Sequence, residues 1–128
     1  RVTYADCTLG NHVYYGRYPD LLEAARGEFF RHLGTSFLEY QEEGIFFPVS
    51  EVHLKYFAFA EYDDELSIEC RMSAIRGARL GFGYLITKGE GLRILGGETL
   101  HGCTNAAGRA SRLPAALVEK LRPYLDEN

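Results

Sequence analysis

The sequence holds few cysteines, and their arrangement is unsuited to cross-linking. Cys7, Cys70 and Cys103 are odd in number and lie far apart along the 128 residues. A disulfide framework uses an even number of cysteines, and a zinc site uses short ligand spacings that these three do not have. We therefore expect the chain in a reducing cytoplasm, with no metal site.

Clustered positive charge and long apolar runs are also absent. The formal net charge is −4, with 14 basic and 18 acidic residues, whereas a nucleic-acid-binding face needs grouped lysines and arginines. The nearest such group, Arg71, Arg76 and Arg79, suits a small phosphorylated ligand better than a duplex. No apolar run reaches the length of a membrane span, and no signal-peptide pattern opens the chain. The expected partners thus include neither nucleic acid nor membrane.

The rest of the composition is that of one ordinary globular domain. The hydrophobic content is 46% and the charged content 25%, both typical of such chains. A length of 128 residues is enough for one core but not for two. We expect a single domain over residues 1–128, since no repeat, linker or low-complexity tract divides it.

One long helix is predicted between Tyr18 and Leu33. Its apolar stripe, spaced to fall on one helix face, consists of Tyr18, Leu21, Leu22, Ala25, Phe29 and Leu33. Pro19 near its start and Gly34 after its end favour these limits. A short strand, Val2 to Tyr4, and a polar, glycine-bearing loop precede the helix.

The pattern after the helix is mainly that of strands. Residues 35–46 predict a short helical or irregular connection, after which the apolar period changes to two. The predicted strands run from Pro48 to Ala58, Leu66 to Ala74, Leu80 to Ile86, and Leu92 to Thr104. The Gly96-Gly97 pair predicts a bulge in the last of them. Short links between consecutive strands predict an antiparallel meander, and Pro114 opens a closing helix.

This order of elements predicts an α+β fold. A sheet of about five antiparallel strands must curl around the one long helix, because a single helix cannot cover a flat sheet of that width. Exposed sheet edges and a half-covered face then favour a homodimer.

The opening stretch, Tyr4 to Tyr18, carries a resemblance to a known family. It reads Tyr-Ala-Asp-Cys-Thr-Leu-Gly-Asn-His-Val-Tyr-Tyr-Gly-Arg-Tyr and is followed by Leu-Glu-Ala-Ala-Arg-Gly-Glu-Phe-Phe over residues 22–30. Both segments resemble the hotdog-fold acyl-CoA thioesterases, in particular the 4-hydroxybenzoyl-CoA thioesterase and YbgC-like families. The similarity continues through residues 62–66, 79–80, 97–101 and 108–114, so it covers nearly the whole chain.

The resemblance implies both a fold and an activity. The fold is the hotdog, a curved antiparallel sheet around a central helix. The activity is hydrolysis of an acyl-CoA or acyl carrier protein thioester to a free acid and a thiol. No cofactor is implied beyond the coenzyme A of the substrate. The assembly is a homodimer or homotetramer with sites between subunits.

The sequence departs from the family at one position. The family's opening Asp-x-Asp carries the catalytic carboxylate on its second acidic residue, and the ungapped match places Asp6 on the first and Thr8 on the second. A threonine hydroxyl without a neighbouring base cannot replace a carboxylate. This leaves open a non-hydrolytic protein that only binds acyl-CoA or acyl carrier protein. Dehydratase chemistry is less expected, since hotdog dehydratases carry a histidine in a different motif.

The oxyanion site implied by the resemblance remains. The family presents backbone N–H groups at the start of the central helix to the thioester oxygen, here near Tyr14 and Tyr15. Helix N-terminal N–H groups stabilise a developing negative charge.

Three side chains are candidates for the missing base, and each has a structural alternative. Glu23 borders the apolar stripe, where partial burial would raise its basicity, or it forms an ordinary ion pair with Arg26. His12 is a base or a helix cap. Asp6 is a base after a small loop shift, or it holds the loop by accepting backbone N–H bonds.

Four further residues are predicted to contact substrate. Asn11 orients a water or caps the helix, and Tyr18 lies at the helix start. Arg76 and Arg79 flank a hairpin where the family places basic residues near the CoA phosphates, with ordinary turn arginines as the alternative. The 9 Tyr and 8 Phe residues mostly fill the core, so they do not imply an aromatic acyl group.

Overall fold

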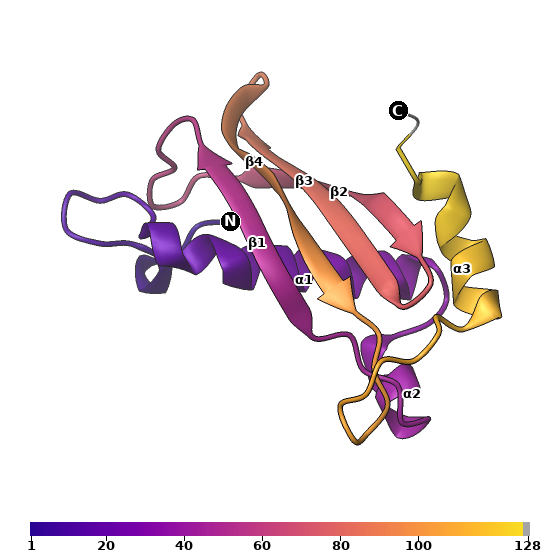
Figure 1. Ribbon diagram of the computed structural model, residues 1–128. Coiled ribbons are helices and arrows are strands. Elements are labelled where there is room, and N and C mark those ends of the chain that lie inside the picture. The colour runs from indigo at the N-terminus through magenta and orange to yellow at the C-terminus, as the bar shows by residue number, and fades with distance from the viewer. Residues whose placement is uncertain (127–128) are drawn as a thin grey trace.

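The structure is a computed structural model that describes residues 1–126. Three α-helices, α1 to α3, and four strands, β1 to β4, follow one another with three short 3₁₀ turns, η1 to η3 (Figure 1). In chain order they are η1 Tyr4–Asp6, η2 Tyr15–Arg17, α1 Tyr18–His32, α2 Phe37–Glu42, β1 Val49–Tyr56, β2 Leu66–Arg76, β3 Arg79–Lys88, β4 Leu92–Gly102, α3 Ala115–Leu121 and η3 Arg122–Tyr124. The long helix, the short helical connection and the closing helix were all predicted from the sequence and are confirmed.

The sheet has the order β1-β4-β3-β2 and is antiparallel throughout. Short turns join β2 to β3 and β3 to β4, so these three strands form the predicted meander. The prediction is wrong for β1, which pairs with β4 at the far edge. Short turns force neighbouring strands together, whereas the longer link from Phe57 to Glu65 leaves the position of β1 free to follow its packing.

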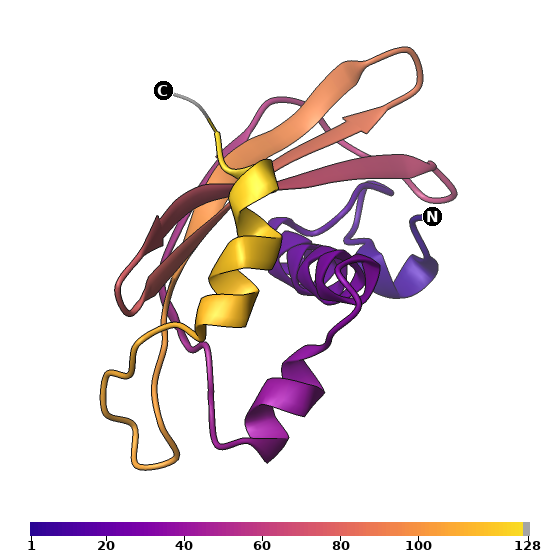
Figure 2. The same ribbon diagram turned by 90° about the vertical axis from the view of Figure 1, so that its right-hand side faces the viewer.

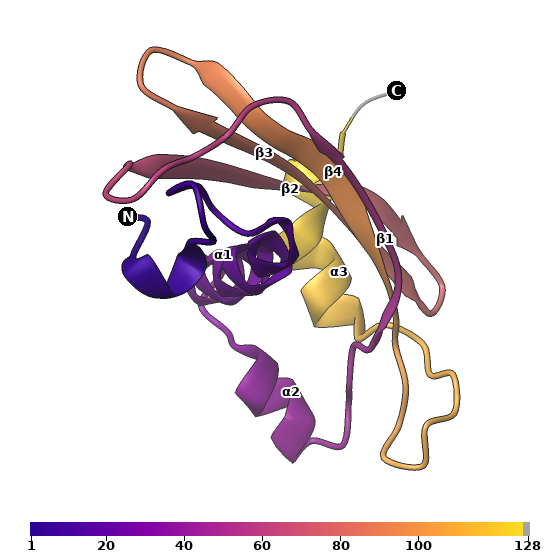
Figure 3. The same ribbon diagram turned by 90° about the vertical axis from the view of Figure 1, so that its left-hand side faces the viewer.

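The sheet curves over α1, which lies along its concave face (Figures 1 and 2). Leu22 and Phe30 of α1 are fully buried against the sheet, as are Phe82 and Ile86 of β3. Burial of each such side chain stabilises the fold by roughly 1.5–3 kcal/mol. α3 packs against β2, at the opposite side of the sheet from β1 (Figure 1). Figure 3 shows α1 almost end-on beneath the curved sheet. Within residues 1–126, no helix packs closely against β1.

Two local predictions are wrong. Residues 2–4 do not form a strand: the chain turns into η1 because the Asp6 side chain accepts hydrogen bonds from Thr3. The sheet therefore has four strands in the described chain, not five. The Gly96-Gly97 pair is not a bulge, since pairing runs through it without a shift. Glycine is needed at 97 because an added Cβ would clash with the carbonyl oxygen of His53.

Within residues 1–126, no helix is both long and apolar enough to cross a membrane.

Candidate active site

The opening loop forms a tight hairpin ahead of α1. Cys7 and Val13 pair across it, and the Thr8 N–H donates to the His12 carbonyl at 2.9 Å. Gly10 and Asn11 at the tip have φ angles of +94° and +62°, a region in which glycine and asparagine are the best-tolerated residues.

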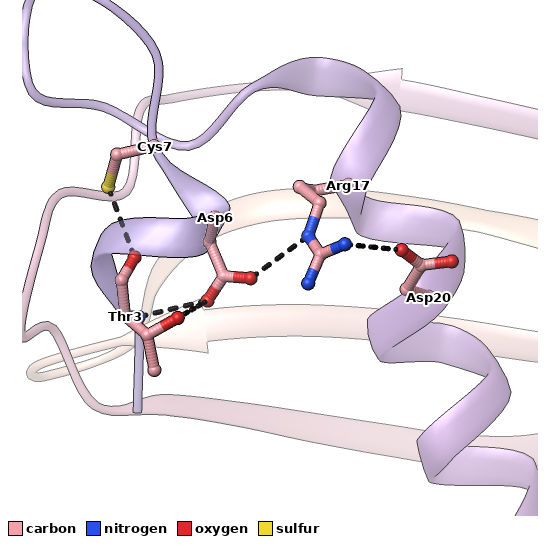
Figure 4. Close-up of polar contacts among 5 residues, drawn as sticks. All are labelled: Thr3, Asp6, Cys7, Arg17 and Asp20. Atoms are coloured by element: carbon pink, nitrogen blue, oxygen red, sulfur yellow. Dashed lines mark hydrogen bonds and ion pairs between the residues drawn. The ribbon is translucent and has the colours of Figure 1, made fainter.

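Asp6 is held by three hydrogen bonds in the base of this loop (Figure 4). Its carboxylate accepts from the Thr3 N–H at 2.9 Å, the Thr3 hydroxyl at 3.1 Å and the Arg17 Nε at 3.0 Å. Arg17 also bonds Asp20 at 2.9 Å. The Thr3 N–H, with Arg17 adding to it, lowers the pKa of the Asp6 carboxyl against the opposing effect of burial. Asp6 thus has the contacts of the loop-holding alternative.

The entry to α1 leaves backbone N–H groups free. The Tyr14 N–H is occupied, because it donates to the Asp6 carbonyl at 2.9 Å. Within residues 1–126, the N–H groups of Tyr15 and Gly16 have no hydrogen-bond acceptor, and no side chain caps η2 or α1. Of the two predicted oxyanion donors, Tyr15 is available and Tyr14 is not, while Gly16 is an available donor that was not predicted.

An apolar pocket of about 190 Å³ lies beside this free helix end. Aromatic side chains dominate its lining, which consists of Val13, Tyr15, Tyr18, Tyr56, Phe57, Ala58 and Phe59. The pocket joins the opening loop, the first turn of α1 and the end of β1. Tyr18, one of the predicted substrate contacts, lines this pocket.

Neither Thr8 nor His12 has the contacts of a general base. Thr8 is exposed, and among the described residues no carboxylate bonds its hydroxyl. The His12 ring stacks on Phe59 with centroids 4.4 Å apart, and its Nδ1 is buried with no partner in the described chain. The helix-cap alternatives for His12 and Asn11 are wrong, since neither side chain caps η2 or α1.

Glu23 is exposed, so the predicted partial burial is wrong, and it is not paired with Arg26, so the predicted ion pair is also absent. Arg26 instead donates to the Tyr84 hydroxyl at 3.0 Å, beneath the helix. Leu21 of α1 faces Ile68 of β2 across a shared groove. Glu23 follows two residues later and so lies about 200° farther round the helix. It therefore points toward the open, β1 side of α1.

Arg76 and Arg79 lie at the opposite end of the sheet from the opening loop. They pair across the β2–β3 hairpin and line a hollow of about 740 Å³ with Ser50 and Leu100. Neither arginine forms a salt bridge with a described residue. Within one chain, the predicted substrate contacts thus lie in two separate places. Arg76 and Arg79 are at one end of the sheet, and Asn11 and Tyr18 are at the other end, in the opening loop and the start of α1.

Sequence reasoning missed two residues that shape this end of the molecule. Arg17 binds Asp6 across 11 positions, and the Tyr56 hydroxyl donates to the Tyr15 carbonyl across 41 positions at 3.1 Å. No spacing in the sequence indicates either contact.

Comparison with known proteins identifies the family. A model of the thioesterase-like superfamily matches residues 2–121. The chain belongs to the thioesterase-like superfamily. Acyl-CoA thioester hydrolase YbgC of Escherichia coli is 31% identical to this thioesterase over 123 residues, which are 95% of this chain and 92% of the relative. The predictions of the family and of a thioester hydrolase are confirmed.

Solved structures show the same fold. A hypothetical protein from Thermus thermophilus superposes on this thioesterase with a TM-score of 0.90 and 29% identity, covering 97% of this chain and 95% of the other. A 1,4-dihydroxy-2-naphthoyl-CoA thioesterase from Synechocystis gives a TM-score of 0.88 at 18% identity, covering 95% and 91%. The predicted hotdog fold is therefore confirmed.

Proposed function

We propose that this protein hydrolyses acyl-CoA thioesters at the N-terminal end of α1. The observation that carries the proposal is the pair of free N–H groups of Tyr15 and Gly16, uncapped at a helix start and next to an apolar pocket. A thioester carbonyl placed there would receive two hydrogen bonds as its oxygen gains charge. The pocket beside it would accept the start of the acyl group.

The attacking water needs a base, and we propose Glu23. Asp6 already accepts three hydrogen bonds, Thr8 has no carboxylate, and His12 is stacked on Phe59. Glu23 lies on the flank of α1 that faces the uncovered part of the sheet. In a homodimer joined along β1, this flank would face the partner, so that Glu23 would lie in the space between the two helices.

The same assembly would join the two groups of substrate contacts. β1 is an edge strand, and an antiparallel pairing with a second β1 would bring the start of one strand beside the end of the other. Arg76 and Arg79 lie near the start of β1, and the pocket lies at its end. The arginines of one subunit would then bind CoA phosphates of a thioester held at the other. Asn11 lies at the exposed tip of the opening loop. Acyl carrier protein is the alternative carrier of the same thioester.

The test is a panel of acyl-CoA thioesters of differing chain length, scored for thiol release, with binding measured in parallel by calorimetry. We expect turnover of at least one thioester. Binding without turnover across the panel would refute the hydrolase and favour a non-hydrolytic acyl-CoA-binding protein.

A further inference from the structure

Tyr56 connects the end of β1 to the first turn before α1. Its hydroxyl donates to the Tyr15 carbonyl oxygen at 3.1 Å. Its ring lies edge-on to the Tyr15 ring, with centroids 6.5 Å apart, and 5.5 Å from the Tyr18 ring. A side chain from the sheet thus holds one backbone group of the turn that carries the free N–H groups.

That carbonyl shares a peptide unit with the Gly16 N–H. A trans peptide is planar, and its C=O and N–H point in opposite directions; residues 1–126 contain no cis peptide. Fixing the direction of the Tyr15 carbonyl therefore fixes the direction of the Gly16 N–H. With the carbonyl turned toward the Tyr56 hydroxyl, the Gly16 N–H points in the opposite direction.

A second ring lies close to the same turn. The Tyr14 ring occupies the space beside the Gly16 Cα, where an added Cβ would lie 2.6 Å from a ring carbon. A larger residue at 16 would therefore require the Tyr14 ring, which is 47% exposed, to move. The direction of the peptide itself is fixed by the hydrogen bond at its carbonyl.

We propose that Tyr56 is a positioning residue for thioester hydrolysis. It orients the Tyr15–Gly16 peptide so that the Gly16 N–H, beside the Tyr15 N–H, donates to the thioester oxygen. This rests on the proposed function. A donor aimed before the reaction stabilises the developing oxyanion without reorganisation at the moment of attack, which is where such sites gain most of their effect.

Tyr56→Phe tests the proposal, because it keeps the ring and removes only the hydroxyl. We expect kcat to fall ~10-fold or more with KM nearly unchanged, since the hydroxyl acts on the oxyanion and not on the bound ground state. Tyr62→Phe is the matched control. Tyr62 is similarly exposed, at 41% against 46% for Tyr56, and its ring stacks on Tyr4 outside the pocket.

Two CoA ligands give a readout that does not need turnover. A CoA trifluoromethyl ketone, whose hydrate carries an oxyanion-like oxygen, should bind Tyr56→Phe ~10-fold or more weakly than the parent. A CoA alkyl thioether, which has no carbonyl, should bind both proteins equally. A general structural role would weaken both ligands together.

The outcomes separate this inference from the proposed function. An inactive parent would refute the hydrolase. The affinities of the parent and of Tyr56→Phe for the ketone and the thioether would still test the positioning role of Tyr56. An active parent with unchanged kcat and unchanged ketone affinity in Tyr56→Phe would overturn the positioning role.

Discussion

Asp6 and Thr8 have different roles in the opening loop although only Cys7 separates them. Asp6 is 5% exposed and accepts hydrogen bonds from Thr3 and Arg17, so its carboxylate stabilises the loop. Thr8 lies in the exposed part of the hairpin, where its N–H bonds the His12 carbonyl and its side chain faces solvent. The position at which the family carries its catalytic carboxylate is thus accessible here but has no charge.

At the residue scale, the first prediction is that Glu23→Gln lowers kcat by ~10²-fold or more. Glutamine keeps the shape and removes the basicity, and this is the size expected for loss of a general base. Thiol release measures the rate, and calorimetry should show nearly unchanged acyl-CoA affinity. Glu28→Gln is the control, because Glu28 is on the other flank of α1 in an exposed pair with Arg31. If Glu23→Gln hydrolyses thioester at the rate of the parent, Glu23 is not the general base.

The second prediction is that Thr8→Asp raises the rate. The change restores a carboxylate at the exposed loop position, where it can act as a nucleophile or base toward a thioester held at Tyr15 and Gly16. We expect an increase of ~10-fold or more in kcat, measured on the thioester the parent hydrolyses best. Thr8→Asn, which has the same shape without the charge, should leave the rate at the parent value. An inert Thr8→Asp that still binds acyl-CoA would show that position 8 is not the only departure.

At the scale of elements, a buried chain of hydrogen bonds joins α1 to the sheet. Arg26 donates to Tyr84 at 3.0 Å, Tyr84 and Thr99 are 2.6 Å apart, and Thr99 and His101 Nε2 are 2.9 Å apart. His101 Nδ1 lies 3.1 Å from the Phe47 carbonyl. The Phe47 carbonyl can only accept a hydrogen bond, so His101 Nδ1 carries a proton. Because burial lowers the pKa of His101 to about 4, the ring is neutral near pH 7, and its Nε2 accepts from the Thr99 hydroxyl.

The third prediction follows from the histidine in that chain. Burial lowers the pKa of His101 to about 4, with Arg26 adding to the effect against the bond to Phe47. The folded state then binds fewer protons than the unfolded state between about pH 4 and 6.5, so stability rises with pH through this window and falls as the solution is acidified. The full loss below pH 4 is about 3 kcal/mol, since each pKa unit corresponds to about 1.4 kcal/mol.

Urea unfolding at pH 4.5, 5.5 and 7 measures this loss. His101→Gln should be less stable at pH 7 and should lose most of the pH dependence in this window. His53→Gln is the control, because the His53 side chain is 60% exposed. A parent whose stability is flat from pH 7 to 4.5 would contradict the assignment of His101.

At the scale of the whole molecule, β1 is the strand that the chain leaves uncovered. It is an edge strand, and Val49, Val52 and Tyr56 are each nearly half exposed. Val52 shares its face with Thr99, which is buried under α1, so Val52 projects from the concave side of the sheet, where it remains 47% exposed. Unpaired edges with apolar side chains are usually covered by another chain.

The fourth prediction is a homodimer joined along β1, with pairing into a tetramer as a further step. Light scattering at micromolar concentration should give at least twice the chain mass. Val52→Lys places a charge in the proposed interface and should give monomers with much lower activity, because each site would lose the partner's residues. Leu92→Lys is the control, since Leu92 is 54% exposed at the β3–β4 hairpin, away from β1. A monomeric parent would refute both the interface and the shared site.

The sequence by itself determined the elements with strong local signals. The stripe from Tyr18 to Leu33 predicted α1, and the alternating segments predicted the strands, because periodicity depends only on near neighbours along the chain. The opening motif indicated the thioesterase family and predicted an oxyanion site at the N-terminal end of α1. The missing carboxylate at Thr8 was also evident from the motif alone.

Only the tertiary structure decided which groups in that region are free and which are occupied. Asp6 is held by Arg17, the Tyr14 N–H is taken by the Asp6 carbonyl, and Tyr56 reaches Tyr15 from a distant strand. The position of β1 beside β4 was likewise decided by packing. Hydrogen-bond partners are selected by distance in space, and a pattern of spacings along the chain does not contain that distance.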